Sequence, residues 1–333
     1  MDKLVSVLIP IYSFNNYCKE SIVSIVNQTF EKLEIILIDD SYDSSLLNYT
    51  NSLNDDRIVL IKGNRKGLSN ALNLGVKYAN GNYIARMDSD DISKLNRIEK
   101  QCFYLLENNL DLCFSNASVF GSHNHNVVFP EFHKDINFLL NIMCPLIHPT
   151  LFIKAEILKK NKYSEKINAA EDYDLWVRLI SQDFKFGNIQ EFLIDYREHH
   201  SQASKLNIHQ NNVSIKIAKQ HSCNYLDPKN FNNMALLKNG FDKSYDFSEV
   251  LCILNILLSE IKQKKLNVNL IKRYTVSLFL RIMEKSINIP IGYLRYCFKN
   301  KLKIDFKLFL YLIFKILFGD YKLEKFHFIK KIY

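Results

Sequence analysis

In the first part of the chain, short apolar runs alternate with segments whose apolar residues recur at helical spacing. Four runs have the length and β-branched character of buried strands, at 4–10, 33–38, 58–61 and 83–87. Apolar residues between positions 17 and 29, and again from 68 to 76, follow the spacing of helices that pack one face on a sheet. This β-α repetition predicts an α/β fold with a doubly wound, mostly parallel sheet flanked by helices.

Two of the predicted strands run directly into carboxylates. The second ends in Asp39 and Asp40, and the fourth is followed by Asp88, Asp90 and Asp91 within four positions. The carboxyl ends of parallel strands meet at one edge of a sheet, where ligands of such folds bind. We therefore expect both groups in one site. An unpaired buried carboxylate is costly, so the second group requires water, cations or both.

The spacing of Asp88 and Asp90 suits a hard cation. If the chain stays extended, side chains two positions apart point to the same side, and Asp91 stands outside this alternation. Paired carboxylate oxygens favour Mg²⁺ or Mn²⁺ held together with phosphates. The alternatives are a solvated acidic turn for this group, and capping of the following turn for Asp39 and Asp40.

The β-α rhythm stops near residue 205, and the remaining pattern is mainly helical. The pattern thus predicts two regions, a domain over 1–204 and a basic helical region over 205–333. The first holds 21 basic and 26 acidic residues, whereas the second holds 23 basic and 9 acidic residues. This uneven charge suggests a catalytic first region and a second region that is attracted to anions.

The second region contains one well-marked amphipathic helix. Asp305 is its predicted N-cap, residues 306–318 form its body, and Gly319 follows it. A helix of about 20 Å is too short to cross a hydrocarbon core of about 30 Å. Lysines spaced by multiples of four gather near one face, which predicts peripheral contact with an anionic membrane. The alternative is an ordinary buried helix of a C-terminal bundle.

Several segments, in order and spacing, resemble glycosyltransferase family 2. They are Ser6–Tyr12 (SVLIPIY), Gln28–Phe30 (QTF), Glu34–Ser41 (EIILIDDS), Gly67–Gly75 (GLSNALNLG), Tyr83–Asp91 (YIARMDSDD), Ala170–Leu179 (AEDYDLWVRL) and Tyr196–His199 (YREH) with Ser204. The resemblance spans roughly residues 4–204. It implies the GT-A fold and an inverting, metal-dependent enzyme that uses a nucleotide-sugar donor.

The resemblance implies a donor site around the first, second and fourth strands. It places the base near Pro10, Tyr12 and Asp40, and the ribose or the metal near Asp88. A carboxylate at Asp40 would accept the imide N–H of uracil, which cytosine lacks at N3, so UDP is the expected nucleotide.

The same resemblance assigns metal and acceptor roles. Asp90, with Asp88, is the expected ligand of Mn²⁺ or Mg²⁺, and His199 completes the metal shell as a neutral imidazole. Asp172 is the expected general base, kept ionised by the helix N-terminus, and Glu171 the expected acceptor contact. Capping of that helix is the alternative for one of these two carboxylates. His148 and His200 are weaker candidates, because a lone loop histidine is more often structural.

The resulting hypothesis is an enzyme that adds one sugar to a lipid-linked or growing surface glycan of the O-antigen, capsule or lipooligosaccharide type. Seven cysteines without a C-x-x-C pair, and a start without a long apolar segment, predict a reduced cytoplasmic protein on the inner face of the cell membrane. The basic region suggests a nucleic-acid-binding protein as an alternative, but it lacks a recognition motif, so no nucleic-acid partner is expected. An inactive, membrane-docked scaffold is the third interpretation.

Truncation before Lys285 tests the membrane hypothesis. It removes eleven basic and three acidic residues, so we expect the shortened protein to lose sedimentation with anionic vesicles. Each basic residue near the surface contributes about 1 kcal/mol and is screened by salt, so binding of the full chain should weaken as salt rises. Equal vesicle binding by the two proteins would contradict membrane docking, and an insoluble truncation would favour the buried-helix alternative.

Overall fold

The structure is a computed structural model, and it describes residues 3–141, 143–167, 169–199, 213–214, 216–218, 220–221 and 263–266. The chain divides into two compact units. The first comprises 1–140 and 144–217, and the second comprises 141–143 and 218–333. His200, Ser204 and the predicted helix at 306–318 lie outside the described residues. None of the helices described here is long and apolar enough to cross a membrane.

The first unit is built on one sheet, which has nine strands among the described residues. The order is β3-β2-β1-β4-β8-β6-β9-β5, and β7 pairs with β6 beside this path. The strands are β1 (Val5–Ile11), β2 (Leu33–Asp39), β3 (Ile58–Lys62), β4 (Tyr83–Arg86), β5 (Ile92–Ser93), β6 (Leu112–Gly121), β7 (His125–Val127), β8 (Phe152–Lys154) and β9 (Phe186–Glu198). The helices are α1 (Asn16–Val26), α2 (Ser44–Leu53), α3 (Leu68–Tyr78), α4 (Arg97–Glu107), α5 (His133–Leu139), the short 3₁₀ helix η1 (His148–Thr150), α6 (Ala155–Lys160) and α7 (Glu171–Ile180).

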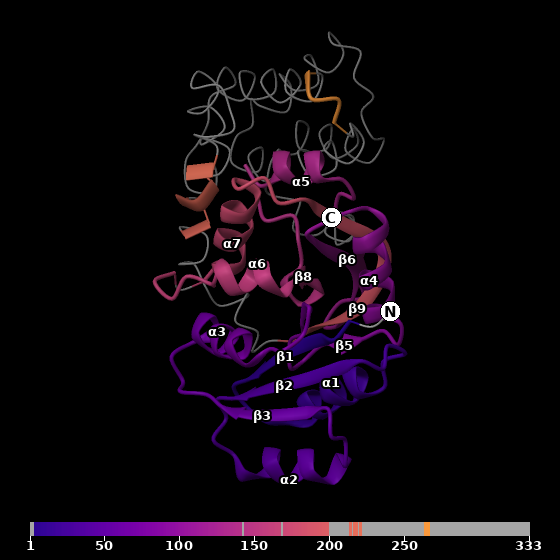
Figure 1. The fold of residues 1–333 in the computed structure, drawn as a ribbon, viewed down its shortest axis with the longest axis vertical. Coiled ribbons are helices and arrows are strands. Elements are labelled where there is room, and N and C mark those ends of the chain that lie inside the picture. Colours follow the sequence, from indigo (N-terminus) through magenta and orange to yellow (C-terminus); the bar gives the residue numbers. More distant parts are fainter. Residues whose placement is uncertain are drawn as a thin grey trace, which may run out of the picture. The chain divides into compact units, whose positions relative to one another are not determined.

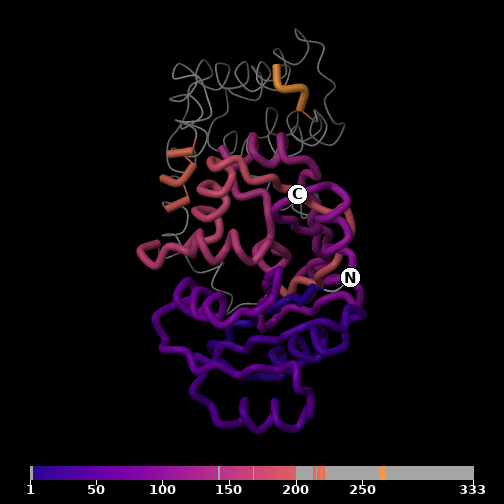
Figure 2. Tube along the Cα trace, in the orientation of Figure 1, coloured from indigo at the N-terminus to yellow at the C-terminus, as the bar shows by residue number. Residues whose placement is uncertain are grey.

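The four predicted strands and two predicted helices are present within a few residues of their expected bounds. They form what we call the parallel half, comprising β1 to β4 and α1 to α3, in which β1 pairs in parallel with both β2 and β4. The rest of the sheet, the mixed half, is different, because β8 runs antiparallel to both β4 and β6. The sheet as a whole is therefore mixed rather than mostly parallel. Figure 1 labels the elements of both halves, and the colours of Figures 1 and 2 follow the chain from indigo at β1 to magenta and later colours in the mixed half.

Strands β1, β2 and β4 of the parallel half are buried on both faces because helices cover both, whereas the edge strand β3 is partly exposed. Cys18, Ile22 and Ile25 of α1 pack with alternate residues of β1 in the main hydrophobic cluster. On the opposite face, α3 approaches β1 and β2 at Gly75. A Cβ there would lie 2.9 Å from the Ile38 side chain and 3.2 Å from that of Leu8. Gly75 is thus the position that permits close packing of this helix.

The amino edge of the parallel strands is held by a buried carboxylate. Glu34 accepts hydrogen bonds from the backbone N–H of Asn80 at 2.5 Å and of Gly81 at 3.1 Å, and from the Ser6 hydroxyl. A side chain at Gly81 would collide with Ser6, whose backbone N lies 2.6 Å from the Cβ position. These bonds fix the turn between α3 and β4, and thereby the level at which β4 ends on the opposite edge.

Candidate active site

The predicted site residues gather at the carboxyl edge of the parallel half. β1 lies between β2 and β4, and the backbone N–H of Asp40 donates to Ile11 at 2.8 Å on one side. On the other side, the N–H of Met87 donates to Leu8 at 3.0 Å. The strand order thus reverses at β1, where crevices open in sheets of this kind. The expected placement of Asp40 and the second carboxylate group on one edge is confirmed.

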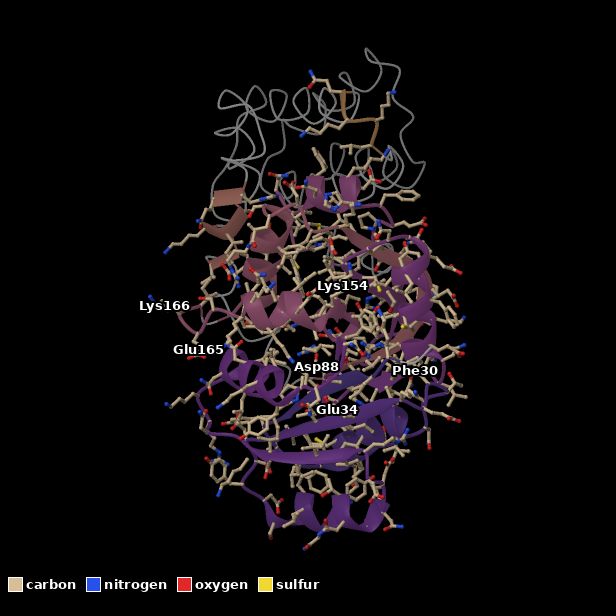
Figure 3. All side chains as sticks on the ribbon, in the orientation of Figure 1. Phe30, Glu34, Asp88, Lys154, Glu165 and Lys166 are labelled. Carbon is tan, nitrogen blue, oxygen red and sulfur yellow. The ribbon has the colours of Figure 1, made fainter. Side chains whose placement is uncertain are left out.

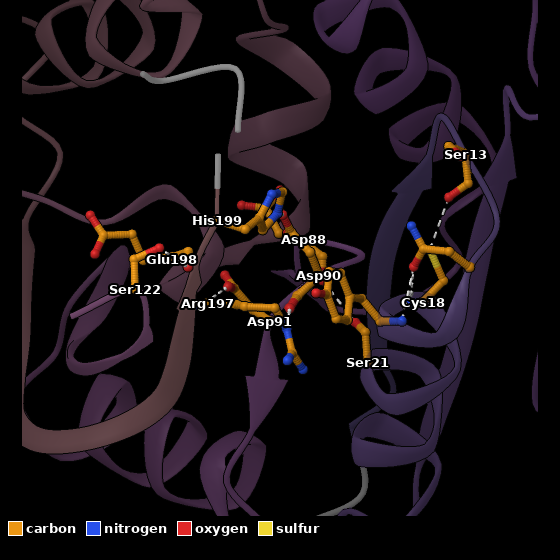
Figure 4. Close-up of polar contacts among 12 residues, drawn as sticks. Ser13, Cys18, Ser21, Asp88, Asp90, Asp91, Ser122, Arg197, Glu198 and His199 are labelled. Carbon is orange, nitrogen blue, oxygen red and sulfur yellow. Dashed lines mark hydrogen bonds and ion pairs between the residues drawn. The ribbon is translucent and has the colours of Figure 1, made fainter. Parts of the chain in front are cut away.

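The chain leaves β4 after Arg86 and turns through three aspartates. One carboxylate oxygen each from Asp88, Asp90 and Asp91 lies within 4.8 Å of the others, and Figure 4 shows the three side chains together. The Ser21 hydroxyl of α1 holds the turn by donating to the Asp88 carbonyl at 2.7 Å. The period-two argument that set Asp91 apart is wrong here, because the residues after Arg86 form a turn rather than a strand. Asp91 therefore belongs to the same cluster.

A buried guanidinium, absent from the sequence prediction, faces this cluster. Arg86 is 2% exposed and donates from both terminal nitrogens to the Asp88 carboxylate, one contact measuring 2.6 Å. Burial lowers the pKa of Arg86, but Asp88 more than offsets this, so its pKa is raised and it stays charged. Burial also raises the pKa of Asp88, and the charge of Arg86 opposes that rise. The signal was available, since an arginine at the end of a predicted buried strand needs a nearby anion.

The end of β9 closes over the cluster. The backbone N–H of Arg197 donates to Asp91 at 2.8 Å, and its Nε donates to the Asp90 carbonyl at 2.8 Å. The guanidinium of Arg197 also lies over the ring of Tyr17, 4.2 Å from its centroid. Asp91 is fully buried, and its second oxygen has no hydrogen-bond partner among the described residues. Burial and the charges of Asp88 and Asp90 raise its pKa well above the usual range.

His199 reaches the cluster as the sequence predicts. Its Nε2 lies 2.9 Å from Asp90 Oδ2, and its ring lies 5.7 Å from that of Tyr17 between centroids. The three aspartates offer carboxylate oxygens, one of them a buried oxygen of Asp91 without a partner among the described residues, and such hard donors suit Mg²⁺ or Mn²⁺. The residues present therefore fit a divalent cation.

A second pair of carboxylates begins α7. Ala169 and Ala170 precede it with φ of 73° and 62°, a left-handed conformation that costs non-glycine residues energy and is typical of functional sites. Glu171 is the first residue of the helix, and Asp172 accepts the backbone N–H of Tyr173 at 2.7 Å. The expected helix is thus confirmed, together with its buried Leu175, Trp176 and Leu179.

The α7 pair does not behave as the helix N-terminus alone predicts. Burial raises the pKa of Asp172 above its ordinary value, although the amide of Tyr173 and the charge of Arg86 oppose this. Burial and the neighbouring Asp172 raise the pKa of Glu171 to about 7. Loss of solvent thus outweighs the favourable backbone contacts of Asp172, so its pKa is raised although it lies at the start of a helix.

The two groups of carboxylates interact through Arg86. The charge of Asp172 raises the pKa of Asp88, and the charge of Asp88 raises that of Glu171, so the groups lie within electrostatic reach. Arg86 lowers the pKa of all three carboxyls. Figure 3 shows Asp88 in the middle of the view, whereas Glu165 and Lys166 project at its left edge.

The remaining predicted residues lie at the ends of β1 and β2. Tyr12 is 76% exposed and Pro10 is half-buried. Asp40 is buried, and its Oδ1 accepts the backbone N–H of Arg65 at 2.8 Å. A Cβ at Gly63 would lie 2.1 Å from that oxygen, so glycine is required for Asp40 to take this position.

The neighbouring Asp39 has a local role. Its Oδ1 accepts the N–H and the hydroxyl of Ser41 at 2.9 and 2.5 Å. This is the turn-capping arrangement that the sequence left open for Asp39. Tyr42 follows with a left-handed φ of 59°, and the guanidinium of Arg65 lies 4.6 Å from its ring centroid.

Comparisons with known proteins agree with this geometry. Residues 6–163 match the profile of the family described as Glycosyl transferase family 2. The chain is 37% identical over 211 residues to an uncharacterized glycosyltransferase of Methanocaldococcus jannaschii, covering 59% of this chain and 72% of the relative. It is 33% identical to the O-antigen biosynthesis glycosyltransferase WbnJ of Escherichia coli, covering 61% of this chain and 82% of WbnJ. It is 32% identical to the minor teichoic acid biosynthesis protein GgaB of Bacillus subtilis, covering 58% and 23%.

Solved structures show the same fold at low sequence identity. S. aureus TarS residues 1–349, in complex with UDP-GlcNAc, matches with a TM-score of 0.58 and 16% identity, over 87% of this chain and 86% of that one. The mannosyltransferase PcManGT of Pyrobaculum calidifontis, in complex with GDP-Man and Mn²⁺, matches with a TM-score of 0.51 and 14% identity, over 96% and 88%. The GT-A-like fold predicted from the sequence is confirmed.

Replacement of Arg86 tests its place in this site. Arg86→Met leaves the half-buried Asp88 beside other carboxylates without its cation, and because breaking a fully buried pair costs about 3–5 kcal/mol of unfolding free energy, that range is the upper bound here. Asp88→Asn in the same chain should recover part of that loss. Arg57→Met is the matched control, because Arg57 pairs with Asp55 at a partly exposed position, where the cost is about 0–1 kcal/mol. Equal urea midpoints for Arg86→Met and Arg57→Met would refute the pairing argument.

Proposed function

This chain belongs to glycosyltransferase family 2, and we propose that it transfers a sugar, with inversion, from a UDP-sugar to a hydroxyl of a surface glycan. The observation that carries the proposal is the shared site where the aspartate cluster, which could hold a cation, and the half-buried carboxyls of Glu171 and Asp172 lie within reach of the charge of Arg86. The names of two relatives, in O-antigen and minor teichoic acid biosynthesis, support a lipid-linked or growing surface glycan as acceptor.

The donor nucleotide binds across the ends of β1 and β2. Tyr12 offers an exposed ring, and Pro10 a rigid backbone, on which the base rests. Asp40 accepts the imide N–H of uracil, with its carboxylate oriented by the backbone of Arg65. The complex of TarS with UDP-GlcNAc supports a UDP-sugar, although the low identity limits that likeness to the fold.

Asp90, Asp88 and His199 would hold the metal. A cation bound there would supply Lewis-acid stabilisation of the leaving nucleoside diphosphate. Arg86 keeps Asp88 in place and compensates its charge, while Asp91 anchors the closing end of β9 through Arg197. The Mn²⁺ in the complex of PcManGT supports a divalent cation, Mn²⁺ or Mg²⁺, as the resident ion.

Asp172 is the general base, and Glu171 contacts the acceptor. As the acceptor oxygen attacks the anomeric carbon, its proton passes to Asp172, while the bond from that carbon to the diphosphate oxygen breaks. A raised pKa suits this role, because a base is most effective when its pKa lies near the working pH. Attack opposite the leaving group inverts the configuration of the sugar.

A panel of nucleotide sugars tests the proposed function. UDP-glucose, UDP-galactose, UDP-GlcNAc, GDP-mannose and ADP-glucose are each incubated with the protein and Mn²⁺ or Mg²⁺. We expect at least one UDP-sugar to be hydrolysed slowly and UDP to raise the melting temperature in the presence of the metal. If no UDP-sugar is hydrolysed and UDP does not raise the melting temperature, the UDP assignment is refuted. If only GDP-mannose is hydrolysed, the donor is a GDP-sugar instead.

Asp90→Ala should abolish metal-dependent binding of UDP, because the cluster loses one carboxylate ligand and His199 loses the contact with Asp90 that holds its Nε2. Calorimetry with UDP and Mn²⁺ measures this directly. Asp195→Ala is the matched control, since Asp195 forms a surface ion pair with Lys94 at 2.7 Å and lies outside the cluster. Unchanged affinity of Asp90→Ala would remove that residue from the metal site.

Asp172→Asn should keep UDP and Mn²⁺ binding but lose turnover, since an amide preserves the shape of the side chain and accepts no proton. Loss of a general base lowers the rate by about 10²–10⁴-fold. The measurement is donor hydrolysis under saturating donor, with the calorimetric affinity as the internal control. A rate like that of the unmodified protein would exclude Asp172 as the base.

A further inference from the structure

A buried histidine, to which the proposed function assigns no role, lies beside the acceptor carboxylate. His148 is the first residue of η1 and is 8% exposed. Its Nδ1 lies 4.0 Å from Glu171 Oε1, and its Nε2 lies 2.8 Å from the hydroxyl of Tyr163. The imidazole thus bridges η1, the segment between α6 and α7, and the first turn of α7.

The far end of this bridge is rigid. Asn73 of α3 binds the backbone of Tyr163 twice, accepting its N–H at 3.0 Å and donating to its carbonyl at 2.9 Å. The rings of Tyr163 and Trp176 pack on the imidazole, with centroids 5.4 and 5.8 Å away. Both ring nitrogens of His148 are therefore held in direction by fixed neighbours.

The contact between His148 and Tyr163 is consistent with either tautomer of a neutral imidazole, because a phenol can donate or accept a hydrogen bond. Burial and the charge of Arg86 lower the pKa of His148 well below its ordinary value, so the imidazole is neutral and carries one N–H. Burial raises the pKa of Tyr163, so its phenol keeps its proton, and when it donates that proton to Nε2 the imidazole is the Nδ1–H tautomer. The single imidazole N–H then sits on Nδ1 and faces the carboxylate.

We propose that His148 is a positioning residue whose Nδ1–H orients the Glu171 carboxylate toward the acceptor hydroxyl. The inference rests on the proposed function, because it takes the α7 pair as the acceptor-side machinery. At 4.0 Å the contact is longer than a hydrogen bond, and it closes when the acceptor fills the site, as catalytic contacts commonly do. His148 itself does not touch the reacting atoms.

The contact also bears on the pH dependence of the α7 pair. Glu171 is faced by Asp172 on its own helix, by Arg86 and Asp88 at the end of β4, and by His148 and Tyr163. An N–H donor stabilises the ionised carboxylate, so its removal raises the pKa of Glu171 further above about 7. The acid limb of the rate profile, which reports the pair as a unit, should then move to higher pH.

Two substitutions of similar size separate positioning from packing. His148→Asn keeps an amide donor near the place of Nδ1 and loses the contact with Tyr163. His148→Gln keeps a polar group near the place of Nε2 and loses the donor toward Glu171. Loss of a hydrogen bond to a charged group corresponds to about tenfold or more in rate, so His148→Gln should be slower than His148→Asn by that factor.

The assay is hydrolysis of UDP-GlcNAc, or of the donor in the panel that is hydrolysed fastest, with Mn²⁺ across pH 5–9. We expect His148→Gln to lose rate and shift its acid limb upward, with UDP affinity unchanged. In the Glu171→Gln background, the two His148 variants should have equal rates. The proposal would be overturned if both variants lost the same rate without a shift in the acid limb of the pH profile. It would also be overturned if the loss of rate followed the loss of melting temperature.

A measurement on the unmodified protein tests, without an activity assay, whether His148 presents an N–H to Glu171. Nitrogen-15 NMR of labelled histidines distinguishes the Nδ1–H and Nε2–H tautomers, and the spectrum of His148→Asn assigns the signal of His148. A neutral Nδ1–H tautomer supports the proposal, and an Nε2–H tautomer or an imidazolium overturns it. If no donor is hydrolysed, the proposed function fails, whereas the tautomer still decides whether His148 presents a donor to Glu171.

Discussion

The burial of the Arg86 guanidinium among carboxylates is the interaction on which the site depends. Three aspartates crowd the turn after β4, and two further carboxyls lie at the start of α7. Removed from water, such charges repel one another, and burial alone raises their pKa values. Arg86 is 2% exposed, is bound directly to Asp88, and lowers the pKa of both α7 carboxyls. One guanidinium thus permits the aspartate cluster and the α7 carboxyls to lie within electrostatic reach of one another.

Arg86 keeps its position because the fold holds the backbone around it. A second buried guanidinium, that of Arg97, donates to the Arg86 carbonyl at 2.8 Å and to the Leu151 carbonyl at 3.4 Å. Its Nε donates to Gln101 at 2.9 Å. Burial lowers the pKa of Arg97 to about 9. These bonds tie the end of β4 to the segment after η1, so the donor-side strand and the element that carries His148 are fixed to each other.

The site is assembled from segments that are distant in the chain. Arg197 and His199 at the end of β9 reach Asp90 and Asp91 across more than a hundred residues. Asn73 of α3 reaches Tyr163 across ninety residues. Contacts of this kind exist only after the mixed half has packed beside the parallel half, and they close the site from two directions. The cation-binding turn is therefore shaped by the whole first unit rather than by its own sequence.

Local patterns were sufficient for the parallel half and for the position of the site. Apolar runs of strand length and helical stripes predicted β1 to β4, α1 and α3, because both faces of that sheet are buried and the two periods differ clearly. The placement of Asp40, Asp88 and Asp90 on one edge followed from parallel strand direction alone. Family resemblance added Glu171, Asp172 and His199, whose grouping no local pattern contains.

Tertiary structure alone decided the direction of β8, the inclusion of Asp91 in the cluster, and the contacts of Arg86 and His148. Antiparallel pairing of β8 depends on where a three-residue strand docks, which its own residues do not encode. The pKa of the Asp172 carboxyl is raised by burial, and this effect outweighs the stabilisation of its charge by the start of the helix. Sequence specifies which groups can ionise, but the energy of each charge is set by the solvent and charges that the complete fold leaves around it.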